Sequence, residues 1–167
     1  MISQWVPLYE SNRDAVKSEL ATLFSVFPEA TVWGNAASGQ GYDVVVLAQT
    51  DPLKVDVEQI IDRLNRDDHV DVIRSLQGVG FLSALDLLAN YAGQAIDLAP
   101  WLHDAEINHD RNLRLQYLAG RGNNLYQEAA IYDEMLAHRR ISDSVFVASD
   151  RRLQELKLRL GNSKPAN

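Results

Sequence analysis

The sequence predicts an α/β (α+β) protein that is rich in helix and has a short three-stranded sheet near its N-terminus. Three apolar segments of strand length lie within the first fifty residues, at 4–9, 31–33 and 42–49. Beyond residue 50, apolar positions recur at spacings of three and four, the period of a helix, and strand signals are absent until Val145. These observations predict strand, helix, strand, loop and strand, followed by a helical region.

The chain shows no linker between these two parts, and its 167 residues match the usual length of one domain. We therefore expect a single compact unit over residues 1–160. It would consist of a strand-helix-strand-strand part at 1–50 and a helical part at 51–160. Residues 161–167 are rich in Asn, Ser, Lys and Pro, so we expect a flexible tail there.

Composition excludes several classes of protein. The formal net charge of −7 disfavours a surface for phosphate backbones, so we expect no nucleic acid partner. The chain has no cysteine, which rules out disulfides and thiolate metal sites. No apolar run approaches the roughly 18 residues of a membrane-spanning helix, and the first residues lack the pattern of a signal peptide. We expect no membrane span and a cytoplasmic location.

The first strand and the helix after it have clear boundaries. Pro7 removes a ladder donor and should end the strand, and Ser11 or Asn12 can cap a helix over residues 13–27. One face of that helix is apolar and contains Val16, Leu20, Leu23, Phe24 and Phe27. Residues 38–41 are rich in glycine and predict a loop. The segment 42–49 that follows is apolar on both faces, which is typical of a buried central strand.

The helical part is predicted from its apolar spacing and its capping residues. Gly93 is placed to close one of these helices as a left-handed cap. Residues 96–102 predict a short turn or helix, whereas residues 113–118 are ambiguous. Helices are expected at residues 57–64, 70–76, 81–91, 127–139 and from Ser149 or Asp150 through Leu160.

Polar residues crowd into one short stretch of the helical part. The stretch contains His103, Asp104, Glu106, His109 and Asp110. Imidazole and carboxylate can together bind a divalent metal, but this spacing matches no strong metal pattern. We expect a solvated loop, with a metal site at His103, His109 and Asp110 as the alternative. No Ser/His/Asp set or carboxylate pair stands out, so we predict no catalytic residue.

A family resemblance extends this interpretation over most of residues 3 to 140. The segments that carry it are Gln4-Trp5-Val6-Pro7-Leu8-Tyr9-Glu10, Val16-Lys17-Ser18-Glu19-Leu20, Phe24-Ser25-Val26-Phe27-Pro28, Thr31-Val32-Trp33, Gly41-Tyr42-Asp43-Val44-Val45-Val46-Leu47, Leu85-Asp86-Leu87-Leu88, Asp97-Leu98-Ala99-Pro100-Trp101-Leu102, Ile107-Asn108-His109-Asp110 and Leu113-Arg114-Leu115-Gln116-Tyr117-Leu118-Ala119-Gly120. In this order, they resemble the C-terminal part of bacterial proteins similar to spermidine synthase. That family transfers an aminopropyl group from decarboxylated S-adenosylmethionine to a polyamine such as putrescine.

The resemblance implies a fold. The family's core is a Rossmann-like methyltransferase sheet, in which residues 4–9 would be the fifth strand. Residues 31–34 and 42–49 would be the terminal antiparallel pair, and the last strand would lie beside the fifth. The resemblance therefore implies a mixed sheet of three strands, which resembles the C-terminal part of the family's sheet.

The resemblance also implies which functional residues the chain has. Gln4 matches a polyamine-binding glutamine and Asp110 a late acidic position, whereas Ala36-Ala37 stand where a tyrosine is expected. The family's nucleoside-binding loop and catalytic acid lie upstream of its fifth strand, where this chain begins. We therefore expect no cofactor in this chain, no catalysis by the chain alone, and a polyamine only in a complete parent protein.

Two further expectations concern partners. The abrupt apolar start favours a chain cut from a longer reading frame, which would leave the outer edge of the first strand unpaired. Exposed edges recruit partners, so we expect a homodimer or higher oligomer across that edge or the apolar surface beside it. The alternative function is a stand-alone protein-interaction or regulatory module.

Overall fold

The computed structural model describes residues 1–37, 40–122 and 125–162 of the chain. Contacts between residues group the chain into two compact units, each drawn from two separate stretches. Unit 1 consists of Met1–Leu53 and Tyr91–Arg140, and unit 2 consists of Lys54–Asn90 and Ile141–Asn167. That residues 1–160 form one domain stays a prediction.

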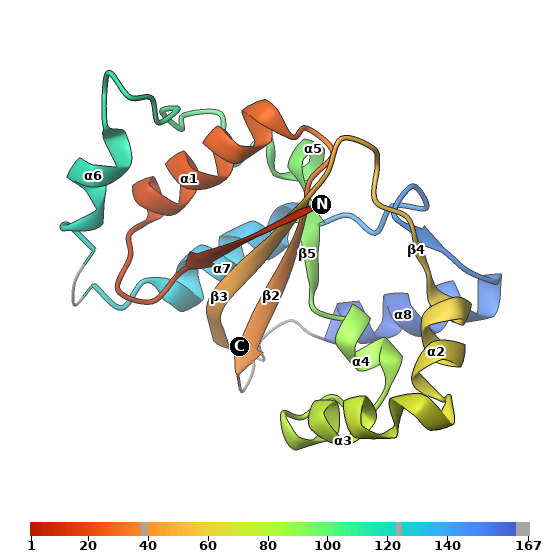
Figure 1. Cartoon of the computed structure of the whole chain (residues 1–167). Helices are drawn as coiled ribbons and strands as arrows, with labels where there is room; N and C mark the ends of the chain where they lie inside the picture. Colours follow the sequence, from red (N-terminus) through yellow and green to blue (C-terminus); the bar gives the residue numbers. More distant parts are fainter. Residues whose placement is uncertain (38–39, 123–124, 163–167) are drawn as a thin grey trace. The chain divides into compact units, whose positions relative to one another are not determined.

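Unit 1 is organised around a four-stranded sheet with the order β1-β3-β2-β5 (Figure 1). All three strand pairs in it are antiparallel. Both β1 and β2 run antiparallel to β3, so they run parallel to each other, and helix α1 (Arg13–Val26) connects them. The strands are β1 (Ile2–Pro7), β2 (Thr31–Ala37), β3 (Gln40–Ala48) and β5 (Tyr91–Gln94). The α/β class is confirmed, and so is the interior position of the segment at 42–49 in the sheet, beside residues 4–9. Burial on both of its faces is not confirmed, because Val45 and Leu47 are only half-buried and Tyr42 is exposed.

The predicted three-stranded mixed sheet is wrong in number and in type, because the sheet has four strands and antiparallel pairs throughout. The fourth strand, β5, comes from the part predicted to be helical. The helix expected at 81–91 is only α4 (Ala84–Leu88), and the Asn90 amide bonds the carbonyls of its last turn. Gly93 has φ +136 within β5 and caps no helix. Of the predicted loop at 38–41, residues 38–39 lie outside the described residues, and Gln40 and Gly41 belong to β3 and not to a loop.

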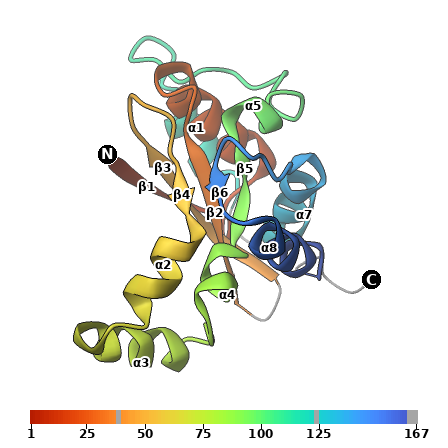
Figure 2. The ribbon, with the colours of Figure 1, turned by 90° about the vertical axis from the view of Figure 1, so that its right-hand side faces the viewer.

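One face of the sheet carries the core of unit 1. The strand residues Val6, Val32, Val44 and Val46 are fully buried and share a cluster with apolar residues of α1, α5 and α7. Figure 2 shows these three helices on the same side of the sheet. The helices of unit 1 are α1 (Arg13–Val26), α5 (Ala95–Leu98), α6 (Arg114–Ala119) and α7 (Glu128–His138). The Asn12 side chain caps α1 through Ala15 N, as predicted.

The opposite face carries a row of large side chains across all four strands. Trp5 pairs with Val45 on β3, which pairs with Trp33 on β2, which pairs with Tyr91 on β5. The rings of Trp33 and Tyr91 meet edge to face, with centroids 5.4 Å apart. Trp5 is 49% exposed, Val45 and Trp33 are half-buried and Tyr91 is fully buried, so exposure along this row falls from the β1 edge towards β5.

Unit 2 is mainly helical. Its helices are α2 (Val57–Leu64), η1 (Asp67–His69), α3 (Val70–Gly78), α4 and α8 (Asp150–Asn162), and a two-residue parallel pair joins β4 (Val55–Asp56) to β6 (Phe146–Val147). The helix predicted at 57–64 is confirmed to the residue. Helix α8 extends to Asn162, past the predicted start of the tail, and residues 163–167 lie outside the described residues.

Candidate functional site

Gln4, predicted to bind substrate, lies on β1 with an exposed side chain. Its amide nitrogen donates to Glu19 Oε1 on α1 at 3.2 Å and to the Trp5 carbonyl at 3.0 Å. Partial burial raises the pKa of the Glu19 carboxyl, and the hydrogen bond from Gln4 opposes that shift. The Gln4 side chain is therefore hydrogen-bonded to helix α1, and its amide lies on the edge strand of the sheet.

Asp43 lies one strand away from Gln4 and is almost completely buried. Its Oδ2 accepts a hydrogen bond of 2.8 Å from the Trp5 indole Nε1, and its Oδ1 is enclosed without a hydrogen-bond partner among the described residues. The pairing of β1 with β3 places the Trp5 and Asp43 side chains diagonally opposite each other on the same face of the sheet. A carboxylate can accept about four hydrogen bonds, so Asp43 has unused acceptor capacity.

Two tyrosines adjoin this carboxylate. The Tyr9 and Tyr42 rings are stacked with centroids 4.3 Å apart, and Trp5 lies 6.1 Å from Tyr9 at 50°. The backbone N–H of Leu8 and that of Tyr9 both donate to the Tyr42 carbonyl at 3.2 Å, which holds the end of β1 against β3. Partial burial, then the nearby Tyr42, raises the pKa of the Tyr9 hydroxyl. Carboxylate and ring faces therefore lie together where β1 ends.

Asp110, the other predicted binding residue, is exposed in a loop over residues 105–113. The loop is fixed to α1, because the Asn108 N–H donates to Thr22 Oγ1 at 2.8 Å. No hydrogen bond or ion pair joins Asp110 to Gln4 in the described part of the chain. A joint substrate site formed by these two residues stays a prediction.

The alternative metal site at His103, His109 and Asp110 is not assembled. His103 Nδ1 lies 2.9 Å from the Pro100 carbonyl, and all three side chains are exposed. Across residues 1–37, 40–122 and 125–162, no group of three or more His, Asp or Glu side chains could hold a metal ion. This finding leaves the prediction of no cofactor untested.

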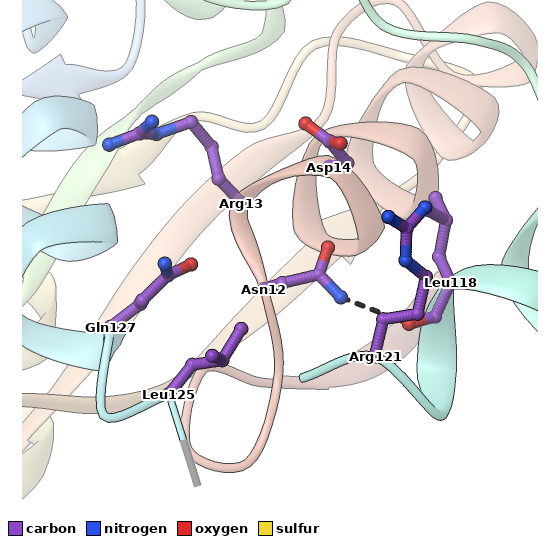
Figure 3. Close-up of a pocket in the computed structure, with 7 residues that line it drawn as sticks. All are labelled: Asn12, Arg13, Asp14, Leu118, Arg121, Leu125 and Gln127. Carbon is purple, nitrogen blue, oxygen red and sulfur yellow. Dashed lines mark hydrogen bonds between the residues drawn. The ribbon is translucent and has the colours of Figure 1, made fainter. Parts of the chain in front are cut away.

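A pocket of about 270 Å³ opens at the start of α1, and its lining is drawn in Figure 3. It is lined by Asn12, Arg13, Asp14, Leu118, Arg121, Leu125 and Gln127. Asn12 anchors it: its Oδ1 accepts from Ala15 N and its Nδ2 donates to the Leu118 carbonyl, both at 2.9 Å. Asn12 thereby ties α6 to the start of α1.

The charges of this pocket are largely neutralised. Figure 3 shows Arg13 and Arg121 on opposite sides of Asn12. Arg13 forms a two-point ion pair with Glu134, which lowers the pKa of that carboxyl against the effect of burial. Besides Arg13, the lining contains one positive side chain, Arg121, and one negative side chain, Asp14. The walls therefore offer a ligand no net charge.

Unit 2 has its own groove, of about 350 Å³, formed by α2, α3, α4 and α8. Its apolar lining consists of Ile61, Leu64, Ile73, Leu82, Ala84 and Leu85. Leu82 lies in the segment 81–91 that was predicted to be one helix, and it is 75% exposed before α4 begins.

The sequence singled out Gln4 as a candidate binding residue, which stays a prediction, and did not single out its neighbours Trp5, Tyr9, Tyr42 and Asp43. Side chains alternate between the two faces of a strand, so the sequence shows which neighbours share a face with Trp5 within residues 4–9, and with Asp43 within residues 42–49. It does not show that Trp5 and Asp43 lie on the same face of the sheet. That requires the antiparallel register of β1 and β3. The signal available in the sequence was Asp43 itself, an acidic residue near the start of an otherwise apolar strand.

Every helix in the described part of the chain is too short or too polar to cross a lipid bilayer. A scan against protein-family models, a search of curated proteins and a search of solved structures found no match to this chain.

Proposed function

We propose that this chain is a non-catalytic module related to the C-terminal part of aminopropyltransferase-like proteins. The observation that supports the proposal is the strand order β1-β3-β2, with a late antiparallel strand between two strands that run parallel to each other. The family resemblance predicts this order for residues 4–9, 42–49 and 31–34. In this proposal, the polyamine and decarboxylated S-adenosylmethionine are substrates of a complete parent protein.

An activity assay tests this proposal directly. The purified chain is incubated with decarboxylated S-adenosylmethionine and putrescine, and the product polyamine is measured by mass spectrometry beside an authentic aminopropyltransferase. We expect no product from the chain, because the proposal assigns it no catalytic carboxylate to orient and deprotonate an attacking amine. Product formation that rises with the concentration of the chain would contradict the proposal.

A second candidate function, a protein-interaction module, is favoured by the outer edge of β1. In the described residues, β1 pairs with β3 alone, and it carries no charged side chain from Ile2 to Pro7. Proteins usually protect such edges with charge, bulges or very short strands. Ile2 and Trp5 are about half exposed on this strand, at 47% and 49%. The edge is therefore suited to adding a strand.

We propose that the added strand is β1 of a second copy. Two antiparallel β1 strands centred on Gln4 would place Gln4 opposite Gln4 and Trp5 opposite Ser3. Opposed residues of antiparallel strands share a face, so the large Trp5 indole would pack beside the small Ser3 side chain. Ile2 would lie opposite Val6 on the other face. The strand is thus complementary to itself in size, and the pairing brings no like charges together.

Gln4→Lys tests this arrangement without sacrificing the fold. Within one chain, the introduced ammonium would lie beside Glu19, which accepts a hydrogen bond from Gln4 in the structure. Across the two-fold axis, two introduced ammonium groups would lie opposite each other, and like charges there destabilise strand pairing. Light scattering should show a dimer for the unchanged chain and a monomer for Gln4→Lys at the same concentration.

Ser75→Lys is the matched control, because it adds the same charge at an exposed position on α3 in unit 2. It should remain dimeric. A monomer for the unchanged chain at every concentration would refute association. A dimer that persists in Gln4→Lys would place the interface on another surface.

A further inference from the structure

The groove of unit 2 has an aliphatic floor. Within unit 2, α4 contacts both α2 and α8, and α2 contacts α3 (Figure 1). Ile61 and Leu64 of α2 and Ile73 of α3 line the groove and are half-buried. Leu82, just before α4, is 75% exposed in the same lining. Within the described part of the chain, the lining includes no aromatic ring. The groove is therefore suited to an alkyl chain.

Helix α8 gives this groove a charged wall. Arg152, Glu155 and Arg159 recur along α8 at spacings of three and four, so they share one face of the helix. All three line the groove, and the other lining residues are uncharged. Two guanidinium groups and one carboxylate leave this wall with one excess positive charge. The groove therefore favours an anionic head group on the alkyl chain.

Arg152 can bind such an anion and keep its present ion pair. Its Nη1 donates to Glu155 Oε2 at 2.6 Å, and the same carboxylate accepts from Arg151 Nε at 3.1 Å. A guanidinium has five N–H donors, and the Arg152 side chain is 36% exposed. One hydrogen bond to a shared carboxylate therefore leaves Arg152 with donors for a second carboxylate.

The other acids near this wall have partners of their own. Asp86 of α4 forms an ion pair with Arg159. Glu58 lies outside the lining, and its Oε1 accepts from the Ser149 hydroxyl at 2.7 Å and from the Ser149 N–H at 3.0 Å. These hydrogen bonds, and more weakly the charge of Arg152, lower the pKa of the Glu58 carboxyl. Both acids thus act on the wall without filling the groove.

We propose that this groove binds an aliphatic carboxylate. The carboxylate accepts hydrogen bonds from Arg152, and the alkyl chain lies against Ile61, Ile73 and Leu82. The groove has a volume of about 350 Å³. Liquid water takes about 30 Å³ per molecule and a methylene group is of similar size, so the groove holds roughly ten carbon atoms. The ligand is therefore a free carboxylate of medium chain length.

Three ligands of equal chain length separate the head group from the chain. Octanoate should bind at least about tenfold more tightly than 1-octanol, because a hydrogen bond between charged groups is a strong one. Octylammonium should bind more weakly still, because the wall is positive. Decanoate should bind more tightly than hexanoate, by up to about fourfold for each added methylene. Equal affinities within either comparison would overturn the proposal.

Isoleucine methyl groups report the site. The chain has eight isoleucines, of which Ile61 and Ile73 line the groove. In a ¹³C–¹H spectrum of the chain labelled at isoleucine δ1 methyl groups, the signals lost in Ile61→Val and in Ile73→Val identify these two. Octanoate should move both in a saturable way, while Ile131, buried in unit 1, stays fixed. Fixed Ile61 and Ile73 signals, or an equal response of Ile131, would overturn the proposal.

Arg152→Gln tests the head-group contact. It should weaken octanoate about tenfold or more and leave 1-octanol unchanged. Arg151→Gln is the matched control, because it removes the same charge from α8 at an exposed position outside the lining. It should bind octanoate as the unchanged chain does. Equal losses in the two variants, or no loss in Arg152→Gln, would overturn the assignment of Arg152.

Leu82→Ser tests the alkyl contact. Leu82 is 75% exposed, so the fold should tolerate the change, and octanoate and 1-octanol should both bind severalfold more weakly. Val79→Ser, at a position 71% exposed and outside the lining, should leave both affinities unchanged. Equal effects of the two variants would contradict the placement of the chain. The inference is independent of the proposed function, which is tested by product formation and by mass.

Discussion

Gly34→Ala tests how α7 is seated on the sheet. Gly34 lies on β2, and a Cβ added there would lie 2.0 Å from the Tyr132 hydroxyl oxygen and 2.6 Å from Cζ. Ordinary contacts between such atoms are about 3.5–4.0 Å. Tyr132 would have to move by more than 1 Å, roughly the difference between these distances. It is buried on α7, in the same cluster as Ile131 and Met135.

The expected cost follows from this overlap. Overpacking of a filled core typically costs about 1–3 kcal/mol, and a hydroxyl and a ring carbon both collide here, so we expect about 2–3 kcal/mol. The measurement is the free energy of unfolding in urea, followed by circular dichroism. Gly120→Ala is the control, because nothing lies within 4 Å of its added Cβ and its φ is −73. It should change stability by less than about 1 kcal/mol.

A double-mutant cycle separates this collision from other effects. In a Tyr132→Ala background the colliding atoms are gone, so Gly34→Ala should then cost little. If Gly34→Ala is as mild as Gly120→Ala, or equally costly with and without Tyr132, the reasoning is refuted.

Two further changes should affect stability in defined ways. Asn12→Ala removes both the cap on Ala15 N and the donor to the Leu118 carbonyl, and should cost about 1–3 kcal/mol in urea unfolding; an unchanged midpoint would contradict this role. Glu19→Gln should stabilise the chain at neutral pH and have little effect below about pH 4. The pKa of Glu19 is raised in the folded state, so its contribution is present at low pH and lost as pH rises through that pKa. A stabilisation confined to low pH would contradict that sign.

The elements predicted well are those whose signals are local. Helix α1 has a side-chain cap at Asn12 and an apolar face, and β3 is an apolar run on both faces, so each is visible without its neighbours. Strand β5 has only four residues, and its Gly93 favours a helix cap as much as a strand. It becomes a strand because Thr31 and Val32 of β2 pair with it. Such non-local pairing is invisible in the local period of a sequence.

The candidate site, too, could be predicted from the sequence only where the signal was local. Gln4 could be placed on a strand from the sequence, and the structure confirms that placement. The association of Trp5 with Asp43 depends on residues 38 positions apart, which only the register of β1 and β3 brings together. Asp110 is the opposite case, because the family resemblance suggested a role for it. Among the described residues, no hydrogen bond or ion pair links Asp110 to Gln4.

The most direct test of the proposed association uses two complementary variants. Gln4→Lys and Gln4→Glu, each purified alone, should be largely monomeric, because each places like charges opposite each other at the centre of the paired β1 strands. Mixed in equal amounts, they should form a heterodimer, detected by native mass spectrometry of isotopically distinct chains. Homodimers of either variant, or a mixture that stays monomeric, would contradict pairing through β1.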